Sequence, residues 1–193
     1  MRLSSDYYLD EDVVTLARSF LGKVLVTHID NKLTSGIITE TEAYAGILDR
    51  ASHAYGDRNT DRTAPMFREG GIAYVYLIYG MYSLFNIVTA PKGIPHAILI
   101  RGIHPLDGIE FMKKRRNMNS GKGFSDGPGK LSRALGIHYS DTGLSLQGDR
   151  IWIEDRKVEI SDGDIIVGPR IRVDYAGKDA LLPYRFNINY EKK

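Results

Sequence analysis

The sequence predicts a mixed α/β (α+β) fold, in which one compact domain, residues 1–193, holds a mainly antiparallel, curved β-sheet with flanking helices. Two observations lead to this prediction. First, 193 residues with 42% hydrophobic content fill one core well and are too few to fill two. Second, successive runs of β-forming residues are joined by short turns, which exclude the helical crossovers that a parallel sheet needs. We find no internal repeat and no linker that would divide the chain.

The N-terminal part predicts one helix followed by two strands. Five apolar residues share one face of the helix: Val13, Leu16, Ala17, Phe20 and Leu21. Asp10 is the expected cap at the start of this helix, and Gly22 is its expected end. Strands are then expected at residues 23–29 and 34–44, joined by a turn at Asp30-Asn31.

The next two segments differ in character. Residues 45–70 are polar and lack a hydrophobic period, and a long irregular segment of this kind inside a compact domain usually serves function. Residues 71–91 carry no charge and are long enough to span a bilayer. They are rich in β-formers, however, and Tyr79-Gly80-Met81-Tyr82 interrupts them as a turn would. We therefore predict a β-hairpin.

The second half of the chain predicts a strand, two helices and three short strands. In chain order they cover residues 97–103, 106–116, 128–135, 151–153, 165–167 and 171–173. A Gly/Ser-rich break at residues 119–125 separates the two helices, and Pro128 opens the second one.

Composition excludes several classes of protein. The chain has no cysteine, which removes disulfide scaffolds, thiolate zinc sites and cysteine nucleophiles. Its five histidines show none of the spacings typical of metal ligands, so we expect neither a metal nor another cofactor. The first residues form neither an apolar signal core nor an Arg/Ser-rich leader, so we expect a cytoplasmic protein without a membrane partner.

Charge is unevenly distributed along the chain. The formal net charge is +2, but residues 101–133 hold eight Lys/Arg against three Asp/Glu, while residues 134–168 hold three against seven. The first segment is therefore a candidate for contact with phosphate. The alternative is that Lys113 to Arg116 merely end a helix, where cations complement the macrodipole.

Glu40 and Glu42 are the first candidates for chemistry. Strict alternation places four residues on one face of the predicted strand: Ile38, Glu40, Glu42 and Tyr44. Carboxylates two residues apart on a strand are roughly 6.6 Å apart, close to the separation of acid and base in inverting glycosidases. The alternative is that both glutamates belong to a solvated strand edge.

Tyrosines are concentrated around the predicted hairpin. Of twelve in the chain, six fall within forty positions: Tyr44, Tyr55, Tyr74, Tyr76, Tyr79 and Tyr82. Aromatic rings stack on bases, and their negative faces favour a purine made cationic by alkylation. Some of the six can equally serve a tyrosine-rich core, although Tyr79 and Tyr82 flank the hairpin tip. Folding at Gly80-Met81 brings Asn86 to within about one residue of facing Tyr76.

A series of short motifs, taken in order, resembles the alkyladenine (methylpurine) type of 3-methyladenine DNA glycosylase. The motifs are Glu40-Thr41-Glu42-Ala43-Tyr44, Ala51-x-His53, Arg58-x-Thr60-x-Arg62, Met66-Phe67, the run from Tyr74 to Tyr82, Asn86, Leu99-Ile100-Arg101 and Gly127-Pro128-Gly129-Lys130-Leu131. The resemblance extends from about Tyr7 to Tyr190. One departure is Asp61, which stands where mammalian relatives have proline.

The resemblance implies a role for individual residues. Glu42 is the implied general base, helped by Arg101 and by the main chain at His53. The implied base-binding pocket consists of Tyr44, Ala51, His53, Tyr76 and Asn86, with Asn86 excluding normal guanine. Tyr79, Met81 and Tyr82 form the implied DNA-inserting tip of the protruding hairpin. Possible phosphate contacts are Arg58, Arg62 and Lys130.

The implied activity is base-excision repair of duplex DNA. The enzyme flips out alkylated or deaminated purines of the 3-methyladenine, 7-methylguanine, hypoxanthine and ethenoadenine class, and hydrolyses the N-glycosidic bond with an activated water to leave an abasic site. We expect a monomer, nucleoid-associated if bacterial, and no lyase activity, because no lysine falls in the matched pocket. In this family Glu40 is not a second catalytic carboxylate, so we assign it to structural support.

Two other functions remain open from the residues themselves. A small carbohydrate glycosidase would use Glu40 and Glu42 together, but it would not need an aromatic hairpin tip. A non-catalytic module that binds damaged DNA would tolerate Glu42→Gln without losing its function, whereas a glycosylase would keep its DNA affinity and lose turnover.

Overall fold

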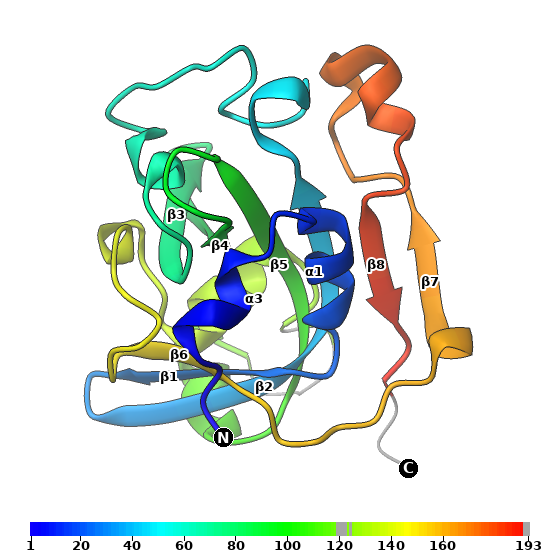
Figure 1. The fold of residues 1–193 in the computed structure, drawn as a ribbon. Helices are drawn as coiled ribbons and strands as arrows, with labels where there is room; N and C mark the ends of the chain where they lie inside the picture. Colours follow the sequence, from blue (N-terminus) through cyan, green and yellow to red (C-terminus); the bar gives the residue numbers. More distant parts are fainter. Residues whose placement is uncertain (119–122, 124, 191–193) are drawn as a thin grey trace.

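Eight strands form one sheet in the computed structural model, which describes residues 1–118, 123 and 125–190 (Figure 1). The strands are β1 (Val24–Ile29), β2 (Lys32–Tyr44), β3 (Ile72–Ile78), β4 (Tyr82–Thr89), β5 (His96–Pro105), β6 (Ile151–Glu154), β7 (Ile165–Gly168) and β8 (Arg185–Ile188). Their order is β3-β4-β5-β2-β1-β6, and β8 pairs with the second half of β2 and with β7. All seven pairings within the described ranges are antiparallel, which confirms the mainly antiparallel sheet.

Short helices surround this sheet. The α-helices are α1 (Val13–Ser19), α2 (Ile109–Arg116) and α3 (Pro128–Leu135). The 3-10 helices are η1 (Ser5–Leu9), η2 (Gly46–Leu48), η3 (Ala64–Phe67), η4 (Tyr139–Asp141), η5 (Asp162–Asp164) and η6 (Asp174–Leu181). The helix expected at residues 128–135 is confirmed, and it begins at Pro128 as predicted. The break expected at residues 119–125 falls mostly outside the described residues.

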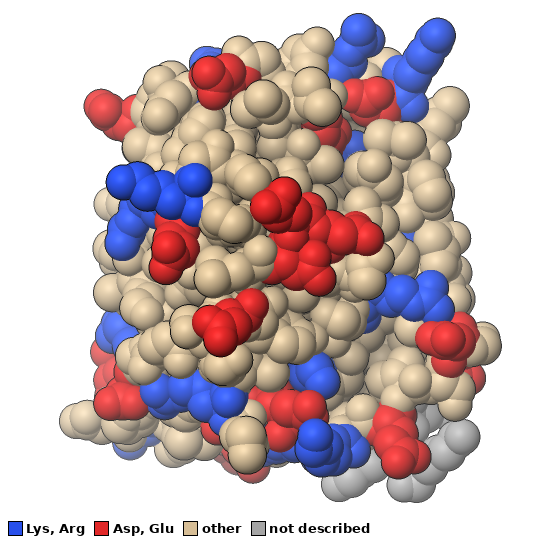
Figure 2. Space-filling view, viewed as in Figure 1, with Lys and Arg blue, Asp and Glu red and all other residues tan. Residues whose placement is uncertain are grey.

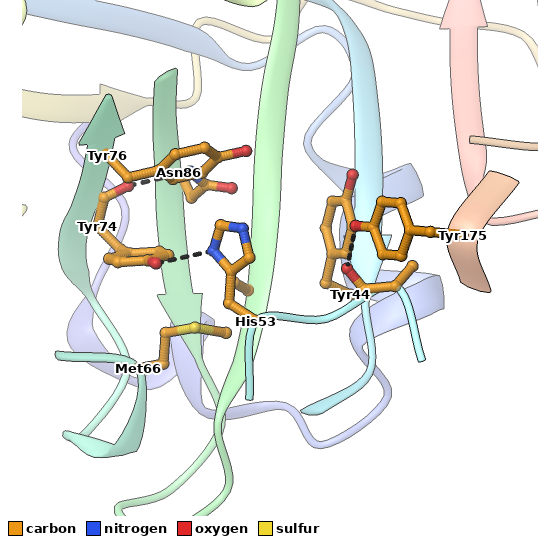
Figure 3. A pocket seen from close by; sticks show the side chains of 9 residues that line it. Tyr44, His53, Met66, Tyr74, Tyr76, Asn86 and Tyr175 are labelled. Atoms are coloured by element: carbon orange, nitrogen blue, oxygen red, sulfur yellow. Dashed lines mark hydrogen bonds between the residues drawn. The ribbon is translucent and has the colours of Figure 1, made fainter. Parts of the chain in front are cut away.

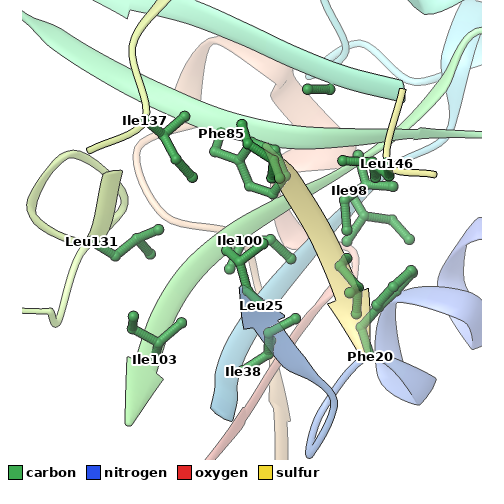
Figure 4. Packing of buried hydrophobic residues seen from close by; sticks show 14 of the residues in the cluster. Phe20, Leu25, Ile38, Phe85, Ile98, Ile100, Ile103, Leu131, Ile137 and Leu146 are labelled. Carbon is green, nitrogen blue, oxygen red and sulfur yellow. The ribbon is translucent and has the colours of Figure 1, made fainter. Parts of the chain in front are cut away.

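The main hydrophobic core lies between the sheet and the helices α1 and α3. Phe20, Phe85, Ile98 and Leu131 meet in this cluster, which Figure 4 shows from close by. Each such side chain stabilises the fold by about 1.5–3 kcal/mol when fully buried. Strands β3 and β4 alternate between two clusters. Ala73, Val75, Phe85 and Ile87 join the main core, whereas Tyr74 and Val88 join a second cluster. The second cluster lies on the opposite face of the sheet, where the polar candidate residues gather.

The two predicted turns are confirmed, and each depends on a left-handed backbone. Asp30 and Asn31 both have φ 55°, as the two central residues of a type I′ turn between β1 and β2 require. At the hairpin between β3 and β4, Ile78 pairs with Tyr82, and φ is 52° at Tyr79 and 68° at Gly80. The charge-free run 71–91 is therefore a hairpin. Within the described residues, no helix has the length and apolar character needed to cross a lipid bilayer.

Strand β2 departs from the strict alternation expected of it. The register with β5 shifts on both sides of Glu40, which pairs with Gly102, while Thr41 pairs with Ile100. An irregularity of this kind reverses the facing of the residues beyond it. Ile38 consequently packs in the main core, as Ala43 does, and does not share a face with Glu40 and Glu42.

Two other expectations were wrong. Asp12, not Asp10, caps α1, because the Asp12 carboxylate accepts hydrogen bonds from the second and third helical N–H groups while Asp10 only accepts from the N–H of Asp12. Residues 171–173 form a bend rather than a strand, with φ 60° at Arg172. The strand near the C-terminus is β8, which sequence periodicity did not reveal.

Candidate active site

A small aromatic cavity lies on the face of the sheet opposite α1 (Figure 3). Its lining consists of Tyr44, Ala51, His53, Met66, Tyr74, Tyr76, Asn86, Ala97 and Tyr175. The structure therefore brings together all five residues expected in the pocket, and adds Met66, Tyr74, Ala97 and Tyr175. The cavity has a volume of about 30 Å³, which is the space of a single water molecule.

His53 forms one wall together with Tyr74 and Tyr76. The His53 ring lies 4.6 Å from the Tyr76 ring, nearly edge to face. Its Nδ1 lies 2.9 Å from the Tyr74 hydroxyl, and its Nε2 lies 3.5 Å from a guanidinium nitrogen of Arg62. Burial, together with the charges of Arg62 and Arg58, lowers the pKa of His53 to about 4. The ring is therefore neutral near pH 7, and because Arg62 can only donate, the remaining proton is assigned to Nδ1.

Asn86 sits at the back of this wall with its amide fixed. Its Nδ2 donates to the main-chain oxygens of Tyr74 at 3.0 Å and of Leu84 at 3.2 Å. Asn86 pairs with Tyr74 across the hairpin, and Tyr76 pairs with Leu84. Asn86 thus lies two residues from facing Tyr76, where about one was expected, because the hairpin is centred on Gly80 and not between Gly80 and Met81. Both side chains still point to the same face.

Glu42 is fully buried and accepts hydrogen bonds from two donors. Its Oε2 accepts from the Tyr44 hydroxyl at 2.8 Å, and its Oε1 accepts from the main-chain N–H of Ile171 at 2.7 Å. Arg101 Nε lies 3.4 Å from the same Oε1. Burial raises the pKa of Glu42, and Arg101, Ile171 and Tyr44 oppose this rise. A raised pKa suits a carboxylate that takes a proton near neutral pH.

Glu42 also contacts a main-chain group that the resemblance did not name. The N–H that reaches Glu42 belongs to Ile171, in the bend after β7. His53 lies on the wall formed with Tyr74 and Tyr76 (Figure 3). Ile171 lies 129 positions from Glu42 in the sequence, so no local pattern points to this contact.

A buried ion pair holds the bend beside the cavity. Arg170 binds the Asp49 carboxylate with both terminal nitrogens and also donates to the main-chain oxygens of Ala43 at 2.9 Å and Asp179 at 3.0 Å. Its guanidinium carbon lies 4.9 Å from the centre of the Tyr44 ring. Asp49 in turn accepts from the N–H of Ala51. This pair therefore ties together the bend, β2 and the segment that carries His53.

The tip of the hairpin exposes a group of large apolar side chains. Tyr79 is 73% exposed and Met81 is 68% exposed, and Tyr82 is about half exposed. A positive φ at a non-glycine residue such as Tyr79 is uncommon and marks a strained position. Behind the tip, a Cβ on Gly129 would approach Tyr82 Cβ to 3.2 Å, so the first turn of α3 lies directly against Tyr82.

The cations expected to contact phosphate have different surroundings. Arg62 lies beside two residues that line the cavity, with its guanidinium carbon 5.2 Å from the centre of the Tyr76 ring and one nitrogen 3.5 Å from His53 Nε2. Arg58 is exposed on the loop before it, and Lys130 lies in the first turn of α3. Arg115, in contrast, donates to the main-chain oxygens of Ile29 and Ala134. Arg115 therefore has a structural role within the Lys113 to Arg116 cluster, because its guanidinium binds main-chain oxygens of two other segments.

The face of the molecule that carries α1 mixes acidic and basic side chains (Figure 2). Among the described residues of this face, acidic side chains separate the basic ones, so they form no continuous basic surface for a polyanion. Among the described residues, no group of three or more His, Asp or Glu is arranged to hold a metal ion.

Comparison with known proteins identifies relatives over nearly the whole chain. The family model described as "Methylpurine-DNA glycosylase (MPG)" matches residues 7–192. A protein of Chlamydia felis, provisionally named a 3-methyladenine DNA glycosylase, is 45% identical over 192 residues, which are 98% of this chain and 97% of its own. A protein of Bacillus mycoides with the same provisional name is 47% identical over 194 residues, 96% of this chain and 94% of its own.

Proposed function

The chain belongs to the methylpurine-DNA glycosylase family, and we propose that Glu42 is the general base with which it hydrolyses the N-glycosidic bond of damaged purines. The activity is that of a monofunctional DNA-3-methyladenine glycosylase in base-excision repair. The observation that carries the proposal is the environment of Glu42, a buried carboxylate held by Tyr44, Ile171 and Arg101 beside an aromatic cavity. We propose that residues 1–193 act as one domain and as a monomer.

The chemical step transfers one proton to Glu42. A water molecule loses this proton to the carboxylate, and its oxygen forms a bond to the sugar carbon C1′. The bond between C1′ and the purine nitrogen breaks, and its electron pair leaves with the base. An alkylated purine already carries a positive charge, so it departs as a neutral molecule without further protonation. A lyase step through a lysine Schiff base is not expected, since none of the described residues lining the cavity is a lysine.

Substrate recognition is proposed for the aromatic walls and the hairpin. Tyr44 lies across the cavity from His53 and Tyr76, so a flipped base would stack between these rings (Figure 3). Their π-faces favour a cationic purine, and a damaged base is easier to unpair. The fixed amide of Asn86 is the proposed barrier to the 2-amino group of guanine. Tyr79, Met81 and Tyr82 are proposed to enter the minor groove of duplex DNA as apolar wedges.

Neither alternative function gains support. Glu40 binds two arginines and lines a polar cavity distinct from the aromatic one, so its carboxylate is held in ion pairs and not placed as the second catalytic group of a glycosidase. A binding module without chemistry would not need a buried carboxylate that costs free energy to keep ionised. A DNA repair enzyme acts where the DNA is, which is the ground for expecting it in the cytoplasm and at the nucleoid of a bacterium.

Base release under single-turnover conditions tests the proposal. We expect the wild type to release base from matched duplexes that contain 7-methylguanine, hypoxanthine or ethenoadenine, and Glu42→Gln to lose at least about 10²-fold in rate, since general-base catalysis contributes 10²–10⁴-fold. Glu42→Gln should keep its affinity for the lesion duplex, because the glutamine is isosteric. Binding of lesion DNA without base release by either protein would instead establish the binding module.

A further inference from the structure

Arg101 is shared between two glutamates. Its Nε lies 3.0 Å from Glu40 Oε1 and 3.4 Å from Glu42 Oε1, so the shorter contact is to the glutamate that is not the proposed base. The irregular register of β2 and β5 around Glu40 brings the three side chains to one face. No other cation within the described residues forms an ion pair with Glu42.

Glu40 has a second cation on its other side. Arg185, on β8, donates to Glu40 Oε1 at 2.9 Å and to the main-chain oxygen of Pro169 at 3.1 Å. Glu40 and Arg185 line a polar cavity of about 240 Å³ that Asp126 also lines, distinct from the aromatic cavity. Charge therefore alternates along one row: Glu42, Arg101, Glu40, Arg185.

We propose that Glu40 is a positioning residue, which draws the Arg101 guanidinium onto its own carboxylate and so leaves Glu42 free to accept a proton from water. This inference rests on the proposed role of Glu42. Without Glu40, Arg101 would be free to pair fully with Glu42, and a carboxylate in a close guanidinium pair is a weaker base. Glu40 itself touches neither the base nor the water.

The charges around Glu42 support this arrangement. Arg101 lowers the pKa of Glu42 and Glu40 raises it, so removing the charge of Glu40 lowers the pKa of Glu42 directly and also lets Arg101 shift toward Glu42. Both effects have the same sign. The other groups that face Glu42 are Tyr44, Arg170, Tyr76, Tyr175 and the N–H of Ile171. None of these is expected to change its charge between pH 5 and 8.

The rate of base release as a function of pH tests the inference. 7-Methylguanine is the suitable substrate, because its positive charge removes the need to protonate the leaving group. The rate then rises with pH as Glu42 loses its proton. For Glu40→Gln we expect this rise to move about one pH unit lower and the plateau rate to fall about threefold to tenfold, since a base of lower pKa is less effective.

A second variant should shift the pH dependence of base release in the opposite direction. Arg185→Gln leaves the negative charge of Glu40 less compensated, so the rise should move to higher pH, and this variant keeps the test valid if Glu40→Gln does not fold. Asp126→Asn is the matched control: it removes one carboxylate from the same cavity, but Asp126 forms no ion pair within the described residues, so its profile should match the wild type.

The outcomes separate this inference from the proposed function. Opposite shifts for Glu40→Gln and Arg185→Gln support the positioning role. Profiles that keep the wild-type midpoint and differ only by a constant factor would show a merely structural role and overturn it. If the wild type releases no base at all, the proposed function itself is wrong.

Discussion

Arg170 and Asp49 are the two residues on which the geometry beside the cavity depends most. Both side chains are almost completely inaccessible to solvent, and Arg170 contacts β2, η6 and the loop that holds His53. Water cannot replace a lost partner at such a site. Breaking this buried pair is therefore expected to cost much more free energy of unfolding than breaking an ion pair on the surface.

We expect Asp49→Ala to lower the free energy of unfolding by about 3–5 kcal/mol, because it leaves the buried Arg170 charge without its partner. Chemical denaturation measures this loss. Asp149→Ala is the control, since Asp149 pairs with Arg2 but its side chain is 93% exposed, and it should cost less than about 1 kcal/mol. Equal effects of the two substitutions would show that the buried pair does not hold the fold together.

Among structural elements, the hairpin of β3 and β4 combines two functions on a single strand pair. One row of side chains enters the main core and the other row, with Tyr74, Tyr76 and Asn86, lines the aromatic cavity. The tip, with the exposed Tyr79 and Tyr82, extends beyond the main core and the aromatic cavity. Because core and cavity share the same strands, packing of the core fixes the position of the strand pair from which the exposed tip extends.

Tyr79→Ser should weaken binding to lesion duplex about tenfold, since stacking of one aromatic ring on a base contributes about 1–3 kcal/mol. The measurement is best made in the Glu42→Gln background, so that no base is released during the titration. Ile166→Ser provides the control, because Ile166 is a 50% exposed apolar residue on β7, at the other edge of the sheet. An affinity unchanged by Tyr79→Ser would remove the wedge from the proposed mechanism.

At the scale of the whole molecule, the two faces of the sheet differ in what they hold. The face under α1 and α3 holds the main core, and the opposite face holds the aromatic cavity. A long polyanion is therefore expected to lie across the cavity side and the hairpin tip, and not across the mixed-charge face of Figure 2. Arg62 lies over the Tyr76 ring of the cavity, and the first turn of α3, which carries Lys130, lies against Tyr82 at the tip.

The salt dependence of DNA binding checks this orientation. Each phosphate contact contributes about −0.9 to the slope of log K against log salt, so Lys130→Gln should make the slope less steep by about one unit. Arg18→Gln should leave it unchanged, because Arg18 lies on α1 and pairs with Asp162. A change of slope for Arg18→Gln and none for Lys130→Gln would show that the DNA binds across the face that carries α1, and would contradict this orientation.

The sequence by itself determined the features that depend only on residues adjacent along the chain. The turn at Asp30-Asn31, the hairpin at 71–90 and the helix opened by Pro128 follow from local backbone chemistry, and the structure confirms all three. Its motifs also named five residues that line the cavity, because a resemblance in short runs preserves which side chains face a shared site.

Only the tertiary structure decided how Glu42 is held, although the resemblance had already named Arg101 as its helper. Its partners Arg101 and Ile171 come from β5 and from the bend after β7, and Arg170 binds Asp49 across 121 positions of sequence. The irregular register at Glu40 further reversed the facing that strict alternation predicted for Ile38. Periodicity describes only which way a side chain points along its own strand. Which distant groups it meets depends on how the strands pair and where the register shifts, and that is settled by packing of the whole chain.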